Sequence, residues 1–382
     1  MSEREGSQRE RRARRTGRLA APPEAGVGVA PASPPEQQAL TVPVKVVVWD
    51  LDGTLWPGVA LESEIAPDPY PEVVSILDVL TARGVLLSVA SRNPTSIGEL
   101  VEGVPVLANR FVAPQFGWGR KVEALRRIAD ELDIGLDTVA FVDDDPFERA
   151  DVERSLPEVV VLAPEELREA LSWPEFDPGP VTSAGRSRLD SYRRRARRRA
   201  ARAEFGGSEE DFLRSCELRA TVREARSEDQ DRLIELARRT TQYNSTGVSY
   251  EPGALTAVIE LSDRFGDDGL VGLASVSAPD GPEWTVELVA VSCRAGGRGA
   301  LPILVTGVAR RARAAGATRL SVWCRLTDRN VPVRLGLRRA GFAATSRNGG
   351  TATFSRDLGD EPGYPDWVAV DDRLSPRPGV PA

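Results

Sequence analysis

The sequence predicts an α/β protein whose first domain is built on a parallel sheet. Short apolar runs alternate with amphipathic stretches over residues 43–178, a pattern typical of strand–helix–strand units whose sheet is covered by helices on both faces. A second set of strand and helix patterns follows over residues 215–360. At 382 residues the chain is also too long for one ordinary hydrophobic core. We therefore expect a three-layer, Rossmann-like domain followed by a second α/β domain.

The individual elements follow from the periodicity of the apolar residues. The strands expected in the first domain are 46–49, 84–91, 104–106, 138–142 and 158–162, and the helices are 121–132 and 164–171. The strands expected in the second domain are 217–222, 270–276, 284–291 and 319–323, and the helices are 227–239, 300–315 and 330–340.

Three segments lie outside these two domains. Residues 1–42 are rich in Arg, Glu, Pro and Ala, so they bury too little apolar surface to offset their ordering entropy, and we expect a disordered tail. Residues 361–382 are Pro-rich and are expected to be a second tail. Residues 179–214 contain a helix-forming run with two arginine triplets, Arg193–Arg195 and Arg197–Arg199. We expect a linker helix whose arginines contact an acidic partner or the acidic domains, in preference to nucleic acid.

The composition excludes several classes of protein. A net charge of -7 argues against a general nucleic-acid binder. Three cysteines do not form a disulfide framework, no apolar run is long enough to span a membrane, and no secretory signal is evident, so we expect a cytoplasmic protein. The chain has no histidine, which rules out a Ser-His-Asp triad, a His-activated cysteine and His-based metal sites. Proton transfer must therefore use carboxylates, Lys, Tyr, Cys or water.

The most informative motif is a pair of carboxylates after the first buried strand. Asp50 and Asp52 follow the run Val46–Trp49 and are two residues apart, so they lie on the same side of an extended chain. In an open parallel sheet, ligands bind at the carboxyl ends of the strands. One carboxylate can attack a phosphorus atom while the other transfers a proton, with a divalent cation to balance the charge. An ordinary Asx turn is the alternative.

Three downstream motifs supply parts of the same site. Ser91 ends the second strand and can donate a hydrogen bond to a phosphoryl oxygen. Lys121 opens a helix and can neutralise a carboxylate and a phosphate together. Asp143 and Asp144 follow a third strand, and their oxygens suit Mg²⁺. Each motif is weak alone, but together with D-x-D-G-T in this order they resemble motifs I to IV of the haloacid dehalogenase (HAD) superfamily.

A second candidate site lies in the second domain. The loop Arg294-x-x-Gly297-x-Gly299 falls between a strand and a long helix and resembles the pyrophosphate loop of the GNAT acyltransferase fold. Glycines let backbone N–H groups approach phosphate oxygens, and a helix amino terminus favours negative charge. Coenzyme A and a carrier protein's phosphopantetheine arm both offer such a phosphate.

Cys293 adjoins the loop and is the best nucleophile candidate of the three cysteines. Alternatively, it serves only as a small buried apolar residue. Cys216 fits an apolar pattern, and Cys324 is ambiguous.

A HAD-type domain followed by a GNAT-like domain resembles the FkbH-like family. The resemblance covers residues 44–345 and is carried by several strings, namely residues 49–56, 91–93, 141–149, 241–244, 263–272, 292–299, 330–333 and 341–342. Two positions depart from the family pattern: Gly53 stands where the family has Asn, and Arg92 stands where it has Lys.

The resemblance implies an enzyme of natural-product assembly, in particular polyketide biosynthesis. It would take a glyceryl unit from 1,3-bisphosphoglycerate and load it, through an enzyme cysteine, onto an acyl carrier protein, with Mg²⁺ as cofactor. The implied catalytic residues are Asp50, Asp52 and Cys293. The implied phosphate-binding residues are Ser91, Arg92, Asn93, Lys121, Arg294, Gly297 and Gly299, and the implied metal site comprises Asp50, Asp52, Asp143 and Asp144.

Three other functions stay open from the sequence. The chain could be a stand-alone phosphatase whose second domain binds substrate, a non-catalytic module that docks a carrier protein, or an N-acyltransferase that uses coenzyme A. Neither nucleic acid nor a membrane is expected as a partner.

Overall fold

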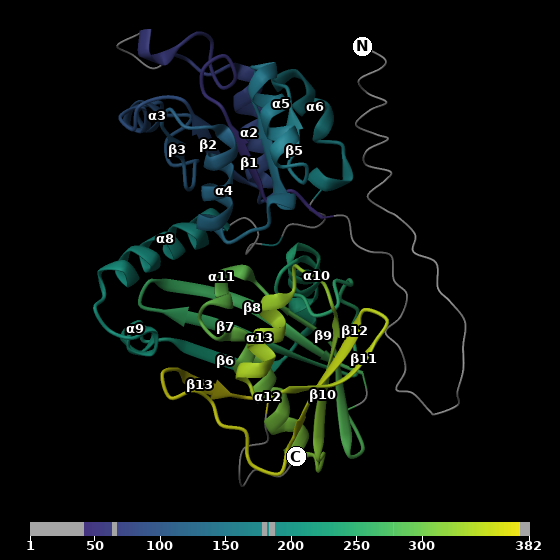
Figure 1. Cartoon of the computed structure of the whole chain (residues 1–382). Coiled ribbons are helices and arrows are strands. Elements are labelled where there is room, and N and C mark those ends of the chain that lie inside the picture. The colour runs from purple at the N-terminus through teal and green to yellow at the C-terminus, as the bar shows by residue number, and fades with distance from the viewer. Residues whose placement is uncertain (1–41, 63–66, 178–181, 183–187, 278, 375–382) are drawn as a thin grey trace. The chain divides into compact units, whose positions relative to one another are not determined.

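The computed structural model of the chain describes residues 42–62, 67–177, 182, 188–277 and 279–374. The expected tail at residues 1–42, apart from its last residue, lies outside the described part. The described elements belong to one compact unit that runs from Gln37 to Ala382. Within it, the strands form a five-stranded and an eight-stranded sheet, so the predicted α/β class with a parallel first sheet is confirmed (Figure 1).

The first sheet is wholly parallel, with strand order β3-β2-β1-β4-β5. Its strands are β1 (Val46–Trp49), β2 (Leu86–Ser91), β3 (Gln115–Phe116), β4 (Val139–Val142) and β5 (Val160–Leu162). Its helices are α2 (Pro71–Ala82), α3 (Ile97–Gly103), α4 (Lys121–Leu132), α5 (Pro146–Ser155) and α6 (Leu167–Ala170), with 3-10 turns η2 (Ala60–Glu62), η3 (Leu136–Thr138), η4 (Pro164–Glu166) and η5 (Pro174–Phe176).

Strand β1 is buried on both faces, which explains its unbroken apolar sequence. Val47 and Trp49 pack into the core cluster that contains the apolar side of α2. Val46 and Val48 point the other way, into the cluster that contains the apolar side of α4. Both patterns follow from the two-residue period of a strand. Because helices cover both faces, only the carboxyl end of β1 remains for chemistry.

The second sheet is mixed, with strand order β11-β12-β10-β9-β8-β7-β6-β13. Its strands are β6 (Arg219–Glu224), β7 (Leu255–Asp263), β8 (Gly266–Val276), β9 (Glu283–Val291), β10 (Arg319–Arg325), β11 (Ala343–Asn348), β12 (Thr351–Asp357) and β13 (Ala369–Asp372). Its helices are η6 (Ser227–Asp229), α10 (Gln230–Arg239), α11 (Cys293–Gly296), α12 (Ala300–Ala314) and α13 (Val331–Arg339). Buried residues of α12 and α13 share one core cluster, and those of α10 share another, so helices cover both faces.

The arginine-rich segment forms helix α8 (Arg188–Glu204), which is followed by α9 (Glu209–Ser215). Its arginines bind carboxylates of the chain itself, which is one of the two alternatives expected from the sequence. Arg198 donates to both oxygens of Asp263 at 2.7 and 3.0 Å, and Arg194 donates to Asp268 at 3.0 Å. On another side of the helix, Arg195 pairs with Asp133 at 2.9 Å. The charge run is therefore largely structural.

Two sequence expectations are wrong. Residues 104–106 form turns after α3 instead of a strand, since Pro105 cannot donate to a ladder. The two-residue strand β3, which was not expected, pairs with β2. Part of the expected tail at 361–382 is folded, because β13 pairs in parallel with β6. The last residues of that tail, 375–382, lie outside the described part.

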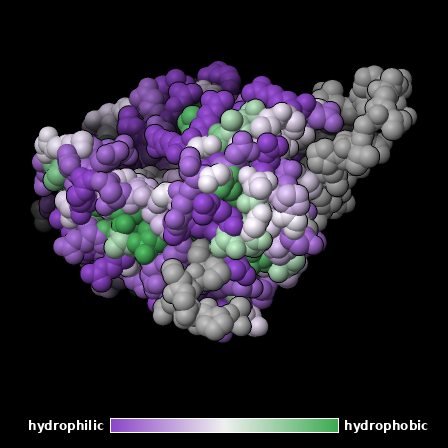
Figure 2. Space-filling view, turned by 90° about the horizontal axis from the view of Figure 1, so that it is seen from below, coloured by the Kyte–Doolittle hydropathy of each residue, from purple (hydrophilic) through white to green (hydrophobic). Residues whose placement is uncertain are grey.

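None of the helices in the described part of the chain has both the length and the apolar composition needed to span a membrane. The face shown in Figure 2 is mainly hydrophilic, with small hydrophobic patches set between polar side chains.

Candidate functional site

The carboxyl ends of the three central strands of the parallel sheet carry the predicted site. Asp50 follows β1, Ser91 ends β2 and Asp143 follows β4. Strands β2 and β4 are the two neighbours of β1 in the sheet. Residues far apart in the sequence therefore meet at one edge of the sheet, where the strand order reverses and α/β proteins bind ligands.

Lys121 provides the positive charge of the site. Its ammonium group, at the start of α4, donates to the carboxylate of Asp50 and to the carbonyl oxygen of Ala90. It also lies 3.4 Å from Oδ2 of Asp143. The side chain is buried, so this ammonium is held between two carboxylates. The predicted convergence of Lys121 on Asp50 is thus present in the fold.

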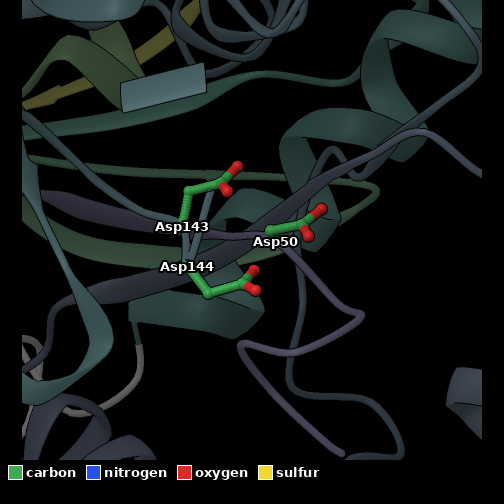
Figure 3. Close-up of side chains that lie close together, drawn as sticks. All are labelled: Asp50, Asp143 and Asp144. Carbon is green, nitrogen blue, oxygen red and sulfur yellow. The ribbon is translucent and has the colours of Figure 1, made fainter. Parts of the chain in front are cut away.

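Asp50, Asp143 and Asp144 form a candidate metal centre. One oxygen from each lies within 4.8 Å of the others, and Figure 3 shows the three carboxyl groups extending to the same side. Oδ2 of Asp143 is buried without a hydrogen-bond partner. A set of carboxylate oxygens, one of which accepts no hydrogen bond, fits Mg²⁺, which prefers oxygen ligands and keeps several waters.

The electrostatics of the cluster also favour a bound cation. Burial raises the pKa of Asp50, although the charge of Lys121 opposes this effect. Burial likewise raises the pKa of Asp143 to about 6, against the opposing charge of Lys121 and with a further rise from Asp50. One ammonium is therefore insufficient for the negative charge gathered here, and a divalent ion would complete the balance.

Gly53 is required by the approach of Asp144. Its φ is +73°, in the left-handed region, and a Cβ built there would lie 2.4 Å from Oδ2 of Asp144. Thr54 holds the same carboxylate, since its hydroxyl donates to Oδ1 of Asp144 at 3.0 Å and accepts from the Asp144 N–H at 2.9 Å. Sequence reasoning missed Thr54, although it belongs to the D-x-D-G-T motif.

Asp52 lies apart from the three carboxylates of the metal cluster. Its Oδ1 accepts hydrogen bonds from Nε1 of Trp56 at 2.8 Å and from the N–H of Ala60 at 2.9 Å, and its Oδ2 accepts from Nδ2 of Asn93 at 2.9 Å. These three donors fix the carboxylate in place. Of the four carboxylates that the sequence predicts as metal ligands, Asp52 is thus the one outside the cluster.

The residues after β2 divide between two roles. Asn93 is buried and donates to both Asp52 and Ser91, so it connects the second carboxylate of the D-x-D motif to the hydroxyl at the end of β2. Arg92 is nearly half exposed and pairs with the buried Glu148 at 2.7 Å. Its guanidinium is therefore held by a carboxylate of α5 in this structure.

The second predicted site has Cys293 at its centre. Cys293 follows β9, begins α11, and lines a pocket together with Arg294 and Ser292. Cys216 and Cys324 are also buried and reduced, and burial raises the thiol pKa of both, to about 12 for Cys324. Their thiolates are therefore strongly disfavoured near neutral pH. Neither residue lines this pocket.

The predicted phosphate loop has a partly covered glycine. Gly297 has open space around it, but a Cβ at Gly299 would lie 2.4 Å from the ring of Trp367. Pro302, in the first turn of α12, offers no backbone N–H. Arg298 ion-pairs with Asp268 and Asp263. The Trp367 ring therefore lies over one glycine of this loop, and the Arg298 guanidinium is paired with carboxylates of the chain.

Comparison with known proteins gives structural neighbours of two kinds. No family model and no curated protein matches the sequence. The N-terminal part of BF1531 from Bacteroides fragilis, which contains a phosphatase domain complexed with Mg, is 26% identical over 34% of this chain and 39% of that chain, with a TM-score of 0.30. Nourseothricin acetyltransferase is 20% identical over 36% of this chain and 98% of that chain, with a TM-score of 0.27. Ard1 from Thermoplasma volcanium is 16% identical over 37% and 99%, with a TM-score of 0.28.

Our chain thus spans well under half of the phosphatase-containing structure and nearly all of each acetyltransferase. Because the TM-scores are low, the function proposed below depends on the geometry of the two sites.

Proposed function

We propose that this chain is a Mg²⁺-dependent enzyme that removes phosphate from 1,3-bisphosphoglycerate and loads the glyceryl unit onto an acyl carrier protein. The donor has a phosphate monoester at one end and an acyl phosphate at the other, whereas a glyceryl thioester retains neither. Two reactions are needed, and the chain has two candidate sites. The observation that supports the proposal best is the meeting of Asp50, Lys121, Asp143 and Asp144 at one sheet edge.

The phosphate monoester would be cleaved at the first site. An oxygen of Asp50 attacks phosphorus, the bond to the glyceryl oxygen breaks, and the leaving alkoxide takes a proton from Asp52. Asp52 then accepts a proton from the water that attacks the aspartyl phosphate, which releases inorganic phosphate and regenerates Asp50. Ser91 and Lys121 would bind the phosphoryl oxygens. Mg²⁺ held by Asp50, Asp143 and Asp144 would supply charge neutralisation.

The acyl phosphate would react at the second site. The thiolate of Cys293 attacks the carbonyl carbon, the carbon–oxygen bond to phosphate breaks, and an enzyme thioester forms. The thiol of a phosphopantetheine arm then attacks this thioester, and the Cys293 thiolate leaves. An acyl phosphate is already activated, so this route needs no histidine, which the chain lacks.

Intact mass spectrometry tests the proposal directly. We expect the protein, incubated with 1,3-bisphosphoglycerate, Mg²⁺ and a phosphopantetheinylated carrier protein, to add about 88 Da per carrier thiol, the mass of a glyceryl group transferred by covalent catalysis. Phosphate release without any mass gain on a carrier would contradict transfer and favour the stand-alone phosphatase.

Replacement of the relay residue separates the two sites. We expect Cys293→Ala to abolish the acyl adduct on the enzyme while phosphate release from the monoester continues. Cys324→Ala is the matched control, because that thiol is buried away from the pocket. An adduct that persists in Cys293→Ala would overturn the relay assignment.

A further inference from the structure

The pocket that contains Cys293 is strongly cationic. It lies within the compact unit from Gln37 on, and its volume is about 30 Å³, which exceeds the roughly 10–15 Å³ that one water molecule needs. Its charged lining comes from the residue that precedes β1, from α8 and α10 and from the segment after β9, and comprises Lys45, Arg188, Arg232, Arg239, Arg294 and Glu235. Five cations thus share a small space with one carboxylate.

Glu235 cannot balance this charge. Its carboxylate accepts from Arg232 at 3.1 Å and lies 3.4 Å from Nε of Arg239. Three of the cations, Lys45, Arg188 and Arg294, have no carboxylate within ion-pair distance among the residues that the structure describes. The undescribed stretches 178–181 and 183–187, which precede α8 in the sequence, contain no Asp or Glu.

Arg294 has free hydrogen-bonding capacity toward the pocket. The side chain is more than nine-tenths buried. Its Nε donates to the hydroxyl of Ser292 at 3.1 Å, and no other described residue accepts from its guanidinium. Burial, together with the positive charges of Arg232 and Arg188, lowers the pKa of Arg294 to about 10. A buried guanidinium whose two terminal nitrogens have no acceptor is costly, and an anion in the pocket would relieve that cost.

Lys45 and Arg239 help to keep the pocket in shape. The Lys45 ammonium donates to the Thr241 hydroxyl at 3.1 Å, and Arg239 donates to the carbonyl oxygens of Gly84 and Arg83 at 3.1 and 2.6 Å. Burial and the charge of Arg188 lower the pKa of Arg239 to about 9. Carbonyl acceptors satisfy hydrogen bonds without cancelling charge, so the positive potential of the pocket remains.

We propose that this pocket binds the phosphate group of an acyl phosphate, with Arg294 as its main ligand, and thereby holds the carbonyl carbon against the thiol of Cys293. The inference rests on the proposed role of Cys293 as acyl acceptor. As the sulfur–carbon bond forms and the carbon–oxygen bond breaks, the electron pair passes to the departing phosphate, whose charge the guanidiniums stabilise.

The experiment uses the reactivity of Cys293, which does not depend on turnover. The full-length protein in EDTA is treated near neutral pH with iodoacetate, an anion, or with neutral iodoacetamide, and the Cys293 peptide is followed by mass spectrometry. We expect Arg294→Gln to lower the ratio of the iodoacetate rate to the iodoacetamide rate by at least about threefold, because a charged cleft concentrates anions. Arg294→Lys should bring this ratio part of the way back to the wild-type value. Arg197→Gln, an exposed arginine of α8, should leave the ratio unchanged.

Protection by added ligands identifies the anion. We expect inorganic phosphate and acetyl phosphate to slow labelling by both reagents in the wild type and in Arg197→Gln, and to have no effect in Arg294→Gln. Protection by phosphopantetheine but not by phosphate would assign the pocket to the carrier arm and overturn our assignment. If Cys293 resists both reagents, calorimetric titration of phosphate into the wild type and Arg294→Gln in EDTA replaces the labelling, and equal affinities would sink the proposal.

The inference and the proposed function can fail separately. If phosphate protects Cys293 but 1,3-bisphosphoglycerate leaves no acyl adduct, the anion pocket stands and the relay fails. If the adduct forms at the normal rate in Arg294→Gln, the relay stands and the pocket assignment fails.

Discussion

At the scale of single residues, Lys121 and Asn93 connect the carboxylates of the site, since Lys121 pairs with Asp50 and Asn93 donates to Asp52. Asp50 and Asp143 were predictable because each follows a continuous apolar strand, and parallel strands end at a common edge. Two of the three donors to Asp52 were not predictable, since Trp56 and Ala60 reach it through a tight turn. Hydrogen bonds of this kind depend on backbone dihedrals that no residue pattern encodes.

The contact between Gly53 and Asp144 gives a prediction at this scale. In Gly53→Ala, the new methyl group would lie 2.4 Å from the Asp144 carboxylate and push it out of the metal cluster. We expect phosphate release to need a Mg²⁺ concentration about tenfold higher, as measured by titration of the initial rate, since one misplaced carboxylate weakens a site of only a few protein ligands.

Gly58→Ala is the matched control for that change. Gly58 has a similar φ of +75°, but a Cβ at this position would have nothing within 4 Å, so both variants carry the same backbone strain of about 1–2 kcal/mol. An equal rise in the Mg²⁺ requirement in both variants would show that strain, and not the position of Asp144, is responsible.

At the scale of elements, prediction succeeded where one pattern was unambiguous. The helix from Lys121 was predictable because its apolar residues recur at helical spacing. Strand β7 was not expected, since its first five residues are all buried and a continuous apolar run does not distinguish a strand from a buried helix. Strand β11 is fully exposed, so it has no apolar pattern to find.

Helix α8 supplies a prediction about stability. Arg198 is buried and makes a two-pronged pair with Asp263, whose side chain is inaccessible to solvent. We expect Arg198→Met to lower the free energy of unfolding by roughly 2–4 kcal/mol in urea denaturation, because it leaves a buried carboxylate with Arg298 as its remaining ion-pair partner. Arg197→Met on the exposed side should change it by less than about 0.5 kcal/mol. Similar losses in both would show that the pair contributes nothing particular.

At the scale of the whole molecule, the two sites lie in separate sheets and use different chemistry. Because of this separation, we expect each reaction to proceed without the other. We expect Asp50→Asn, incubated with 1,3-bisphosphoglycerate, to accumulate a phosphoglyceryl thioester on Cys293 of about 168 Da, because the covalent step at the thiol does not need the aspartyl nucleophile. Intact mass spectrometry measures the mass of this adduct, and Asp130→Asn, on the exposed side of α4, is the control.

Two other results with Asp50→Asn would lead to different conclusions. An adduct of about 88 Da in Asp50→Asn would show that Asp50 is not the nucleophile of covalent catalysis. No adduct at all, with the variant still folded, would mean that phosphate must leave the monoester before the thiol reacts.

The pairing of β13 with β6 has a practical consequence for how far the chain can be shortened. A protein cut after residue 360 would lose its outermost strand and expose the backbone N–H and C=O groups of β6, which β13 now covers. Open strand edges recruit other chains, so we expect the shortened protein to form concentration-dependent aggregates in light scattering. A protein that ends at residue 374 should stay monodisperse under the same conditions, and equal behaviour of the two would mean that β6 tolerates exposure.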